Sequence, residues 1–296
     1  MPVRQVLLEV HSRLSRSSTN RHGPVAFIAC PSVMPAYPMC MRPGPSKPVQ
    51  GSRCLTFRRL PNGWLVGQFP ALELLGIRHL VTTRLGPNIH QARHQTELIA
   101  SQLAGLLGLA DFAFLRQVHG SQVLMIEGGG GLVGQADGLC TRSRGLLLVA
   151  KSGDCPIVLV ADRTGKAVGF AHASWRATVA GIVPNLIRCM LECGCRPEDL
   201  VACICPSIGP ECFQVGQDVL AAALDGIGPH AEGFFLRRPQ GLFMDLWMAC
   251  ACALRTCGLQ EIYVSEVCST CRPELFPSHR RDGPQAGRFL VSIGLP

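Results

Sequence analysis

The stretch Ser152-Gly153-Asp154-Cys155-Pro156 joins two apolar runs, Gly145-Leu-Leu-Leu-Val-Ala150 before it and Ile157-Val-Leu-Val-Ala161 after it. Short, continuous apolar runs bounded by Gly and Pro are typical of buried β-strands. The ends of such strands are where a rigid scaffold presents side chains to solvent or to a ligand. Cys155 is therefore the first candidate for a functional side chain.

Two histidines lie at the ends of similar runs. His172 follows the run Lys166-Ala-Val-Gly-Phe-Ala171, and His119 precedes the run Ser121-Gln-Val-Leu-Met-Ile126. One thiol and two imidazoles presented in this way would bind a zinc ion with its fourth position open, or would form a Cys-His nucleophile pair. The simpler interpretations are a small core side chain for Cys155 and turn residues for the two histidines. The residues alone leave these alternatives open.

The segments around these residues form a series of short motifs. In chain order they are Val118-His119-Gly120, Ala136-Asp137-Gly138-Leu139-Cys140-Thr141, Asp154-Cys155-Pro156, His172-Ala173-Ser174-Trp175-Arg176, Ile208-Gly209-Pro210, Cys212-Phe213-Gln214-Val215-Gly216 and Ser278-His279-Arg280-Arg281-Asp282. Each motif is weak by itself, but the whole series resembles, in order and spacing, the laccase-domain family. Members of this family carry the old label polyphenol oxidase and are now regarded as purine nucleoside phosphorylases. The resemblance extends from about Arg78 to the C-terminus.

The resemblance implies an α+β fold: a single four-layer α/β/β/α domain with mixed central sheets and a site at the ends of the central strands. The predicted elements agree, since strands and helices alternate without the βαβ rhythm and Gly-rich fingerprint of a dinucleotide-binding fold. Leu55–Leu60 and Trp64–Phe69 predict a hairpin, and His79–Arg84 predicts a further strand. Helices are predicted at His94–Leu109, Thr178–Glu192 and Met244–Cys257, with Pro184 in the first turns of the second.

The resemblance also assigns the metal-ligand and catalytic roles to His119, Cys155 and His172. Zn²⁺ is the expected ion, because it favours nitrogen and sulfur ligands in a tetrahedral arrangement and lowers the pKa of a bound water toward 7; Cu²⁺ is the alternative. Asp154 is not expected to share the ion with its neighbour Cys155, since adjacent side chains on an extended chain diverge. We expect Asp154 to orient one of the imidazoles or to contact the substrate.

The implied reactions are phosphorolysis of adenosine, inosine, guanosine and methylthioadenosine, with hydrolytic deamination of adenosine at the same site. Purine nucleosides and phosphate are thus the expected partners. Phosphorolysis needs an anion site, and a guanidinium group offers a fork of donors matched to phosphate oxygens. Arg280 and Arg281 are the first candidates for this site, and Arg176 and Arg84 are weaker ones.

One departure from the family pattern lies beside His172. The chain has Ala173-Ser174-Trp175-Arg176-Ala177 where the family usually has Ala-Gly-Trp-Arg-Gly. Because only Gly adopts positive φ freely, Ser174 and Ala177 are expected to restrict the backbone at this point.

Charge is distributed unevenly along the chain. The net charge is +8 over 296 residues, and more than half of it lies in residues 1–50, where six basic residues accompany one acidic residue. The remainder is too weakly basic to predict a nucleic-acid-binding face, but it suits an anionic substrate. No apolar run approaches the roughly 20 residues that span a bilayer, so no membrane partner is expected. The sequence leaves the oligomeric state and the preferred nucleoside open.

The sixteen cysteines do not predict a disulfide scaffold, because a chain of this size has enough apolar residues to build a core without one. We therefore expect a reduced, cytoplasmic protein. Cys268-Ser-Thr-Cys271 has the spacing of a metal or redox motif, but no second pair completes a four-thiolate site. We interpret these two residues as structural thiols.

Residues 1–50 differ from the rest of the chain. Seven prolines lie between Ser15 and Gln50, and no clean signal-peptide pattern is present. We expect a disordered, Pro-rich, basic extension, with Met41 as an alternative start, followed by the catalytic domain over residues 51–296.

Three other function classes are considered. A metal-free Cys-His hydrolase needs only Cys155 and His172. Finding a metal ion bound to the isolated protein would argue against this class. A copper-dependent phenol oxidase, which the old family label suggests, is disfavoured because multicopper oxidases need His-x-His pairs and the chain has none. A non-enzymatic protein that keeps the fold is disfavoured by the intact set of His119, Cys155 and His172.

Overall fold

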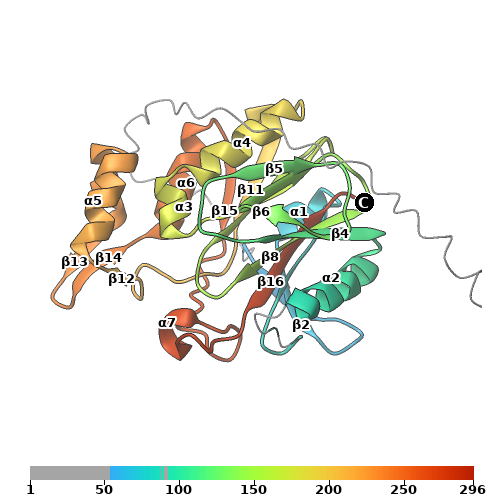
Figure 1. Cartoon of the computed structure of the whole chain (residues 1–296), viewed down its shortest axis with the longest axis horizontal. Helices are drawn as coiled ribbons and strands as arrows, with labels where there is room; N and C mark the ends of the chain where they lie inside the picture. The colour runs from blue at the N-terminus through green and yellow to red at the C-terminus, as the bar shows by residue number, and fades with distance from the viewer. Residues whose placement is uncertain (1–53, 88, 90–92) are drawn as a thin grey trace, which may run out of the picture.

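Two mixed β-sheets form the centre of the molecule (Figure 1). The computed structural model describes residues 54–296 except 88 and 90–92. The seven-stranded sheet has the order β1 (Thr56–Arg59), β2 (Leu65–Gln68), β3 (Arg78–Thr82), β16 (Phe289–Gly294), β8 (Leu146–Ser152), β4 (Asp111–Arg116) and β6 (Gly131–Gln135). The six-stranded sheet has the order β15 (Glu261–Val264), β11 (Leu200–Ile204), β9 (Ile157–Asp162), β10 (Val168–His172), β7 (Gly138–Thr141) and β5 (Val123–Ile126).

Helices cover the outer face of each sheet. Helix α2 (Arg93–Leu107) packs on the seven-stranded sheet, and α4 (Ile182–Glu192) and α6 (Leu246–Thr256) pack on the six-stranded sheet. In Figure 1, α4 lies at the top of the molecule, and α2 lies at the lower right, beneath β4. The expected mixed α+β fold with four α/β/β/α layers is confirmed.

A smaller unit lies beside the two main sheets. It contains a three-stranded sheet of β12 (Gln214–Val215), β14 (Gly241–Met244) and β13 (Phe235–Arg238), covered by α5 (Gln217–Gly226) over a hydrophobic cluster of its own. The remaining elements are short: α1 (Pro70–Leu74), α3 (Trp175–Val179), α7 (His279–Asp282) and the 3₁₀ turns Pro197–Asp199 and Pro229–Phe234.

The apolar runs on either side of Cys155 are buried on both faces. In β8, Leu146, Leu148 and Ala150 pack into the core between the sheets, while Leu147 and Val149 pack under α2. Strand β9 alternates in the same way, with its odd-numbered residues between the sheets and its even-numbered residues under α4 and α6. Because both faces of each strand are buried, apolar residues are favoured on both of them, and the strands have no polar side. Each fully buried Leu stabilises the fold by about 1.5–3 kcal/mol.

Three connections cross from one sheet to the other at the same edge of the sandwich. They run from β4 to β5, from β6 to β7, and from β8 to β9. The three strands that lead into them are parallel neighbours, so their carboxyl ends lie together. Strand β10 also ends there, because His172 pairs with Ile157 at the start of β9. The fold therefore gathers His119, Asp137, Cys155 and His172 at one edge.

The local predictions agree with the structure at most positions. The hairpin is confirmed by the antiparallel pair β1–β2, and the predicted strand corresponds to β3. The predicted helix over Thr178–Glu192 is wrong at its start. Gly181, with φ of 83°, separates α3 from α4, and Pro184 falls in the first turn of α4. Helix α6 begins after Asp245, whose side chain accepts a hydrogen bond from the Met248 N–H, so Met244 belongs to β14.

The expectation for residues 1–50 lies outside the described residues. Within the described part of the chain, no helix has both the length and the hydropathy that crossing a membrane requires.

Candidate functional site

His119, Cys155 and His172 converge at the edge where the sheets are connected. One ligand atom from each residue lies within 4.8 Å of the others, and the two imidazole rings have centroids 5.1 Å apart at an interplanar angle of 61°. His119 is exposed, Cys155 is half-buried and His172 is buried. Zinc bonds of about 2.0–2.3 Å place tetrahedral ligand atoms roughly 3.5 Å apart, so this set of donors fits a zinc ion with one position left open.

Cys155 and His172 favour the charged forms of each other. Burial raises the pKa of the Cys155 thiol, but the charge of His172 and hydrogen bonds from both imidazoles outweigh it and lower this pKa to about 6. Burial lowers the pKa of His172, but Cys155 and Asp137 outweigh it and raise this pKa to about 9. Without a metal, the pair is a thiolate beside an imidazolium. A thiolate is the form that ligates a metal and also the form that acts as a nucleophile.

Asp137 fixes both histidines. The Nδ1–H group of His172 donates to Asp137 Oδ1 over 2.8 Å, which leaves Nε2 of that ring free to bind a ligand. The same carboxylate accepts the backbone N–H groups of Val118, His119 and Gly120 over 3.1, 3.0 and 2.7 Å. These three bonds hold His119 at a φ of 61°, an uncommon conformation for a residue other than Gly.

The expectation that Asp154 orients an imidazole is therefore wrong, and Asp137 has that role. Asp154 Oδ1 accepts the Ser269 hydroxyl over 2.6 Å, and Oδ2 accepts the Arg280 N–H over 2.7 Å. Asp154 thus holds the loop before α7 against the Cys155 turn. Its carboxylate also lines the cavity described below. The motif Ala136-Asp137-Gly138 at a strand junction is the signal in the sequence that could have identified Asp137.

Gln117 fastens the His119 loop to the end of β8. Its side-chain amide donates to the Lys151 carbonyl over 2.8 Å, and its amide oxygen accepts the Lys151 N–H over 2.9 Å. This pair of bonds joins the two chain segments beyond the last parallel β4–β8 pair, Phe114 with Val149, through a side chain. The crossing segments that carry His119 and Cys155 are thereby held side by side.

The three candidate ligands line a cavity of about 630 Å³. Its apolar wall includes Trp175, Ile208, Phe213 and Leu246, and its basic side chains are Arg116, Lys151, Arg176, Arg280 and Arg288. Within the part of the chain that the structure describes, none of these five cations forms an ion pair with an acidic side chain. A cavity with an aromatic wall and unpaired cations is suited to a ligand that has both a flat ring and an anionic group.

Two of the predicted arginines line this cavity. The guanidinium of Arg280 donates to the carbonyl oxygens of Cys212 and Gln214 over 3.1 and 2.9 Å and lies 5.3 Å from the centre of the Phe213 ring. Arg176 lies over its neighbour Trp175, 4.3 Å from the ring centre. Arg280 is therefore fixed by the backbone, whereas Arg176 stacks on Trp175.

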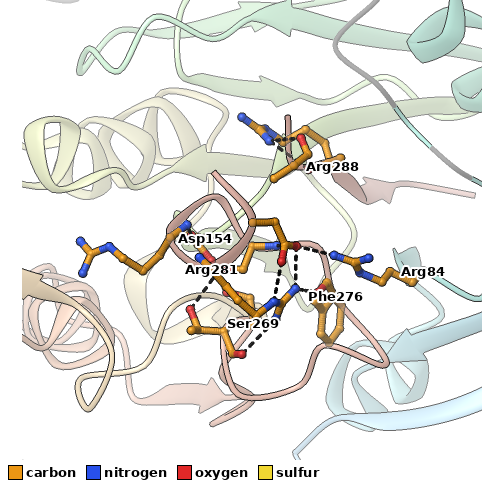
Figure 2. A network of polar contacts seen from close by, with 12 residues as sticks. Arg84, Asp154, Ser269, Phe276, Arg281 and Arg288 are labelled. Atoms are coloured by element: carbon orange, nitrogen blue, oxygen red, sulfur yellow. Dashed lines mark hydrogen bonds and ion pairs between the residues drawn. The ribbon is translucent and has the colours of Figure 1, made fainter. Parts of the chain in front are cut away.

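The other two predicted arginines do not line this cavity, and their substrate contact stays a prediction. Arg281 donates to the carbonyl oxygens of Ser269, Thr270 and Phe276, each over 2.9 Å. Arg84 forms an ion pair with Asp282. Figure 2 shows Arg281 directed toward Ser269 and Phe276, with Arg84 approaching the same network from the other side. Both side chains fix the loop around α7.

Arg116, Lys151 and Arg288 are cavity residues that the sequence did not single out. Arg116 ends β4, Lys151 lies near the end of β8, and Arg288 directly precedes β16. Burial and the nearby charge of Arg288 lower the pKa of Lys151. Two cations close enough to affect one another in this way favour a bound anion, which relieves their repulsion. In the sequence, these three residues are marked only by their positions at strand ends. That these ends are adjacent becomes clear only once the order of the strands in the sheet is known.

Ser174 and Ala177, the two departures from the family pattern, lie at the start of α3. Ser174 is the N-cap of α3, and its hydroxyl accepts the Ala177 N–H over 3.2 Å. Neither residue has a positive φ. The expected restriction of the backbone stays a prediction, and the turn is closed here by a serine cap.

Comparison with known proteins gives matches over the same region. The family model described as "Multi-copper polyphenol oxidoreductase laccase" matches residues 82–296. A protein of Deinococcus radiodurans named purine nucleoside phosphorylase is 35% identical over 237 residues, which cover 75% of this chain and 90% of that protein. Purine nucleoside phosphorylase YfiH of Escherichia coli is 30% identical over 182 residues, covering 62% of this chain and 73% of its own.

Solved structures share the fold as well as the sequence. The Bacillus licheniformis hypothetical protein YfiH superposes with a TM-score of 0.72 at 25% identity, over 81% of this chain and 99% of that one. YlmD from Geobacillus stearothermophilus superposes with a TM-score of 0.69 at 28% identity, over 81% and 98% of the two chains. Because the family match includes all three converging residues and the crossings that carry them, the chain belongs to the multi-copper polyphenol oxidoreductase laccase family, which includes the YfiH proteins.

Proposed function

We propose that this protein is a zinc-dependent purine nucleoside phosphorylase, with adenosine, inosine, guanosine and methylthioadenosine as substrates, and that it also deaminates adenosine. The observation that carries the proposal is that His119, Cys155 and His172 open into one cavity whose walls are aromatic and basic. The printed names of the relatives from Deinococcus radiodurans and Escherichia coli support phosphorolysis. The volume of about 630 Å³ lies within the usual range for small-molecule sites.

His119, Cys155 and His172 would hold the zinc ion. When bound, zinc supplies Lewis-acid activation of water at neutral pH. Asp137 keeps the Nδ1 proton on His172 and thereby presents Nε2 toward the cavity. The low pKa of Cys155 keeps its sulfur in the thiolate form that a metal requires.

The aromatic wall of the cavity would bind the purine base, and the basic wall would bind phosphate. Trp175 and Phe213 offer aromatic faces against which a purine ring stacks. Lys151 and Arg288, with Arg116 near them on the same strand edge, would bind phosphate and neutralise its charge. Arg280 would fix Phe213 and the adjacent backbone, because its guanidinium is already bound to two carbonyl oxygens. Arg176 remains a candidate for direct contact with the ribose or phosphate.

A metal-free Cys-His hydrolase is the second candidate, and the thiolate–imidazolium pair favours it specifically. In that reaction Cys155 would attack a carbonyl carbon, and His172 would donate a proton to the leaving group. Phenol oxidation by a copper cluster is not proposed. Among the described residues, the two groups with metal-ligand geometry contain at most two histidines, and the chain has no His-x-His pair.

The remaining proposals concern the chain as a whole. We propose residues 51–296 as the catalytic domain and residues 1–50 as an extension that activity does not need. Purine nucleosides and phosphate are the proposed partners, in a reduced, cytoplasmic setting without nucleic acid or membrane.

One experiment tests the function. Purified protein is analysed for zinc and copper, and it is then assayed with adenosine in the presence and absence of phosphate. Adenine with ribose 1-phosphate would report phosphorolysis, and inosine would report deamination. Removal of the metal by a chelator should abolish both products, and restoring zinc should restore them. Full activity toward an amide or ester substrate after chelation would support the metal-free hydrolase instead.

A further inference from the structure

A second group of potential metal ligands lies outside the cavity. Cys212, Cys268 and Cys271 place their sulfur atoms within 4.8 Å of one another, and Cys212 Sγ lies 3.3 Å from Cys271 Sγ. Cys212 belongs to the loop that leads into β12, and the other two belong to the loop between β15 and α7. None of the three lines the cavity that contains Cys155.

The spacing of the sulfur atoms matches a thiolate metal site. Three thiolates that bind one zinc ion tetrahedrally, with bonds of about 2.3 Å, lie roughly 3.8 Å from one another. The observed separations, between 3.3 and 4.8 Å, bracket this value. Cys212 and Cys268 are half-buried and Cys271 is exposed, so an ion can enter from solvent and keep a water in the fourth position.

The backbone around Cys268 supports a thiolate. The Gly209 N–H donates to Cys268 Sγ over 3.2 Å. Burial raises the pKa of Cys268, but the backbone N–H groups of Gly209, Cys271 and Thr270 outweigh it, so this pKa is lowered. The N–H groups of Thr270 and Cys271, the third and fourth residues of the C-x-x-C turn, thus approach its first sulfur.

Neighbouring sulfur atoms disfavour the ionisation of Cys212. Burial and the neighbouring sulfurs of Cys271 and Cys268 raise the pKa of Cys212 to about 12. A thiolate at Cys268 therefore opposes the ionisation of Cys212. A divalent ion removes this opposition, because it neutralises two of the three charges and displaces the protons. Arg281, which donates to the Ser269 and Thr270 carbonyls within the C-x-x-C turn, faces the remaining negative charge.

We propose that Cys212, Cys268 and Cys271 form a second metal site, separate from the His119–Cys155–His172 group, that binds Zn²⁺. Soft thiolate ligands select such an ion. The bound ion joins two loops that build one wall of the cavity. The Cys212 carbonyl accepts Arg280, and the loop after Cys271 leads directly into α7, which carries Arg280. By joining these two loops, the bound ion would hold Phe213 and Arg280 in position at the cavity wall.

The test counts zinc ions in the full chain and in matched variants. Wild-type protein, saturated with Zn²⁺ under reducing conditions and freed of excess metal, should hold about two ions per chain. Cys271→Ser should hold about one, as should Cys155→Ala, and the double variant should hold none that survives dialysis. Cys257→Ser, which changes a half-buried cysteine outside both groups, is the matched control and should keep both ions.

Cobalt distinguishes the two sites. With Co²⁺ in place of Zn²⁺, Cys155→Ala should keep strong thiolate-to-cobalt charge-transfer absorption from three sulfurs, whereas Cys271→Ser should lose most of it. Cys212→Ser provides a second variant of the same site.

Equal zinc content and equal cobalt spectra in wild type and Cys271→Ser would overturn the proposal. So would a metal-free wild type whose mass shows the loss of two hydrogens, because Cys212 and Cys271 would then form a disulfide. A failure of the proposed function would appear instead in the Cys155→Ala arm, where the zinc content would equal that of wild type.

Discussion

The Nδ1–H group of His172 donates to Asp137 Oδ1 over 2.8 Å, and the same carboxylate accepts three consecutive backbone N–H groups at Val118, His119 and Gly120. One buried side chain therefore sets both the orientation of one imidazole and the backbone conformation beneath the other. Asp137 thus links the His172 imidazole directly to the backbone of His119. This arrangement requires β6 to cross to β7 beside the His119 loop.

Asp137→Asn should weaken metal binding by about 10–100-fold, as is usual when a partner that orients a ligand is changed. An amide offers one oxygen and an NH₂ group in place of two oxygens, so it cannot accept all four N–H donors. Competition with a chromophoric chelator measures the affinity. Asp225→Asn, at an exposed position of α5, is the control. Wild-type affinity in Asp137→Asn would mean that the imidazoles are held by other contacts.

Lys151→Ala should raise the KM for phosphate by about tenfold or more, because a hydrogen bond from a charged group contributes roughly 1.5–3 kcal/mol. Deamination of adenosine, which uses no phosphate, should change much less. Lys166→Ala is the matched control, since Lys166 is exposed and lies outside the cavity. Equal losses in both activities would remove Lys151 from the phosphate site.

Arg280→Ala should lower phosphorolysis and deamination together. The Arg280 guanidinium is bound to the Cys212 and Gln214 carbonyls and lies near the Phe213 ring, so its removal disturbs a wall that both reactions share. The ratio of the two activities, measured at several phosphate concentrations, is the readout. A selective loss of phosphorolysis would instead show direct contact with phosphate, as the sequence suggested.

Acid should destabilise the fold through His79, which lies far from the proposed chemistry. Its Nε2 accepts the Phe69 N–H over 2.8 Å, and its Nδ1–H donates to the Ile77 carbonyl over 3.0 Å. Burial lowers the pKa of His79 to about 4, despite the bond to the Ile77 carbonyl, which raises it. The unfolded chain takes up this proton near pH 6.5, so the contribution is complete above pH 6.5 and is lost as the pH falls toward 4.

The size of this loss is about 3 kcal/mol between pH 6.5 and 4. Urea unfolding at a series of pH values measures it. In His79→Gln the slope over this interval should be smaller, because the substituted side chain does not titrate. An unchanged slope in that variant would assign the acid sensitivity to other groups.

The sequence predicted those parts of the structure that depend on local pattern. The two apolar runs around Cys155 predicted strands buried on both faces, and β8 and β9 pack with alternating faces in two different cores. The Pro61-Asn62-Gly63 turn predicted the β1–β2 hairpin. The strand-end positions of His119, Cys155 and His172 pointed to side chains that the structure brings together.

Other parts of the site depend on strand order and were not predictable from local pattern. Asp137 and Asp154 occur in similar settings, next to Gly or Cys at a strand end. Only the crossing from β6 to β7, and the pairing of β7 with β10, show which one reaches His172. Arg280 and Arg281 are neighbours in α7, yet only the first lines the cavity. Cys212 joins Cys268 and Cys271 through a bridge between Ser207 and Cys268, a contact between distant segments.

The zinc content and activity of Cys155→Ala, compared with wild type and Cys257→Ala in the same preparation, test the central claim most directly. Cys155 supplies the only sulfur of the three-residue group, so its removal should eliminate zinc from that group. Phosphorolysis and deamination of adenosine should both fall by more than about 100-fold, since changing even a residue that only orients a ligand costs 10–100-fold. Cys257→Ala should retain both activities, and the thermal unfolding of all three proteins should be similar. A Cys155→Ala protein that holds as much zinc as wild type and turns over adenosine at the wild-type rate would contradict the account.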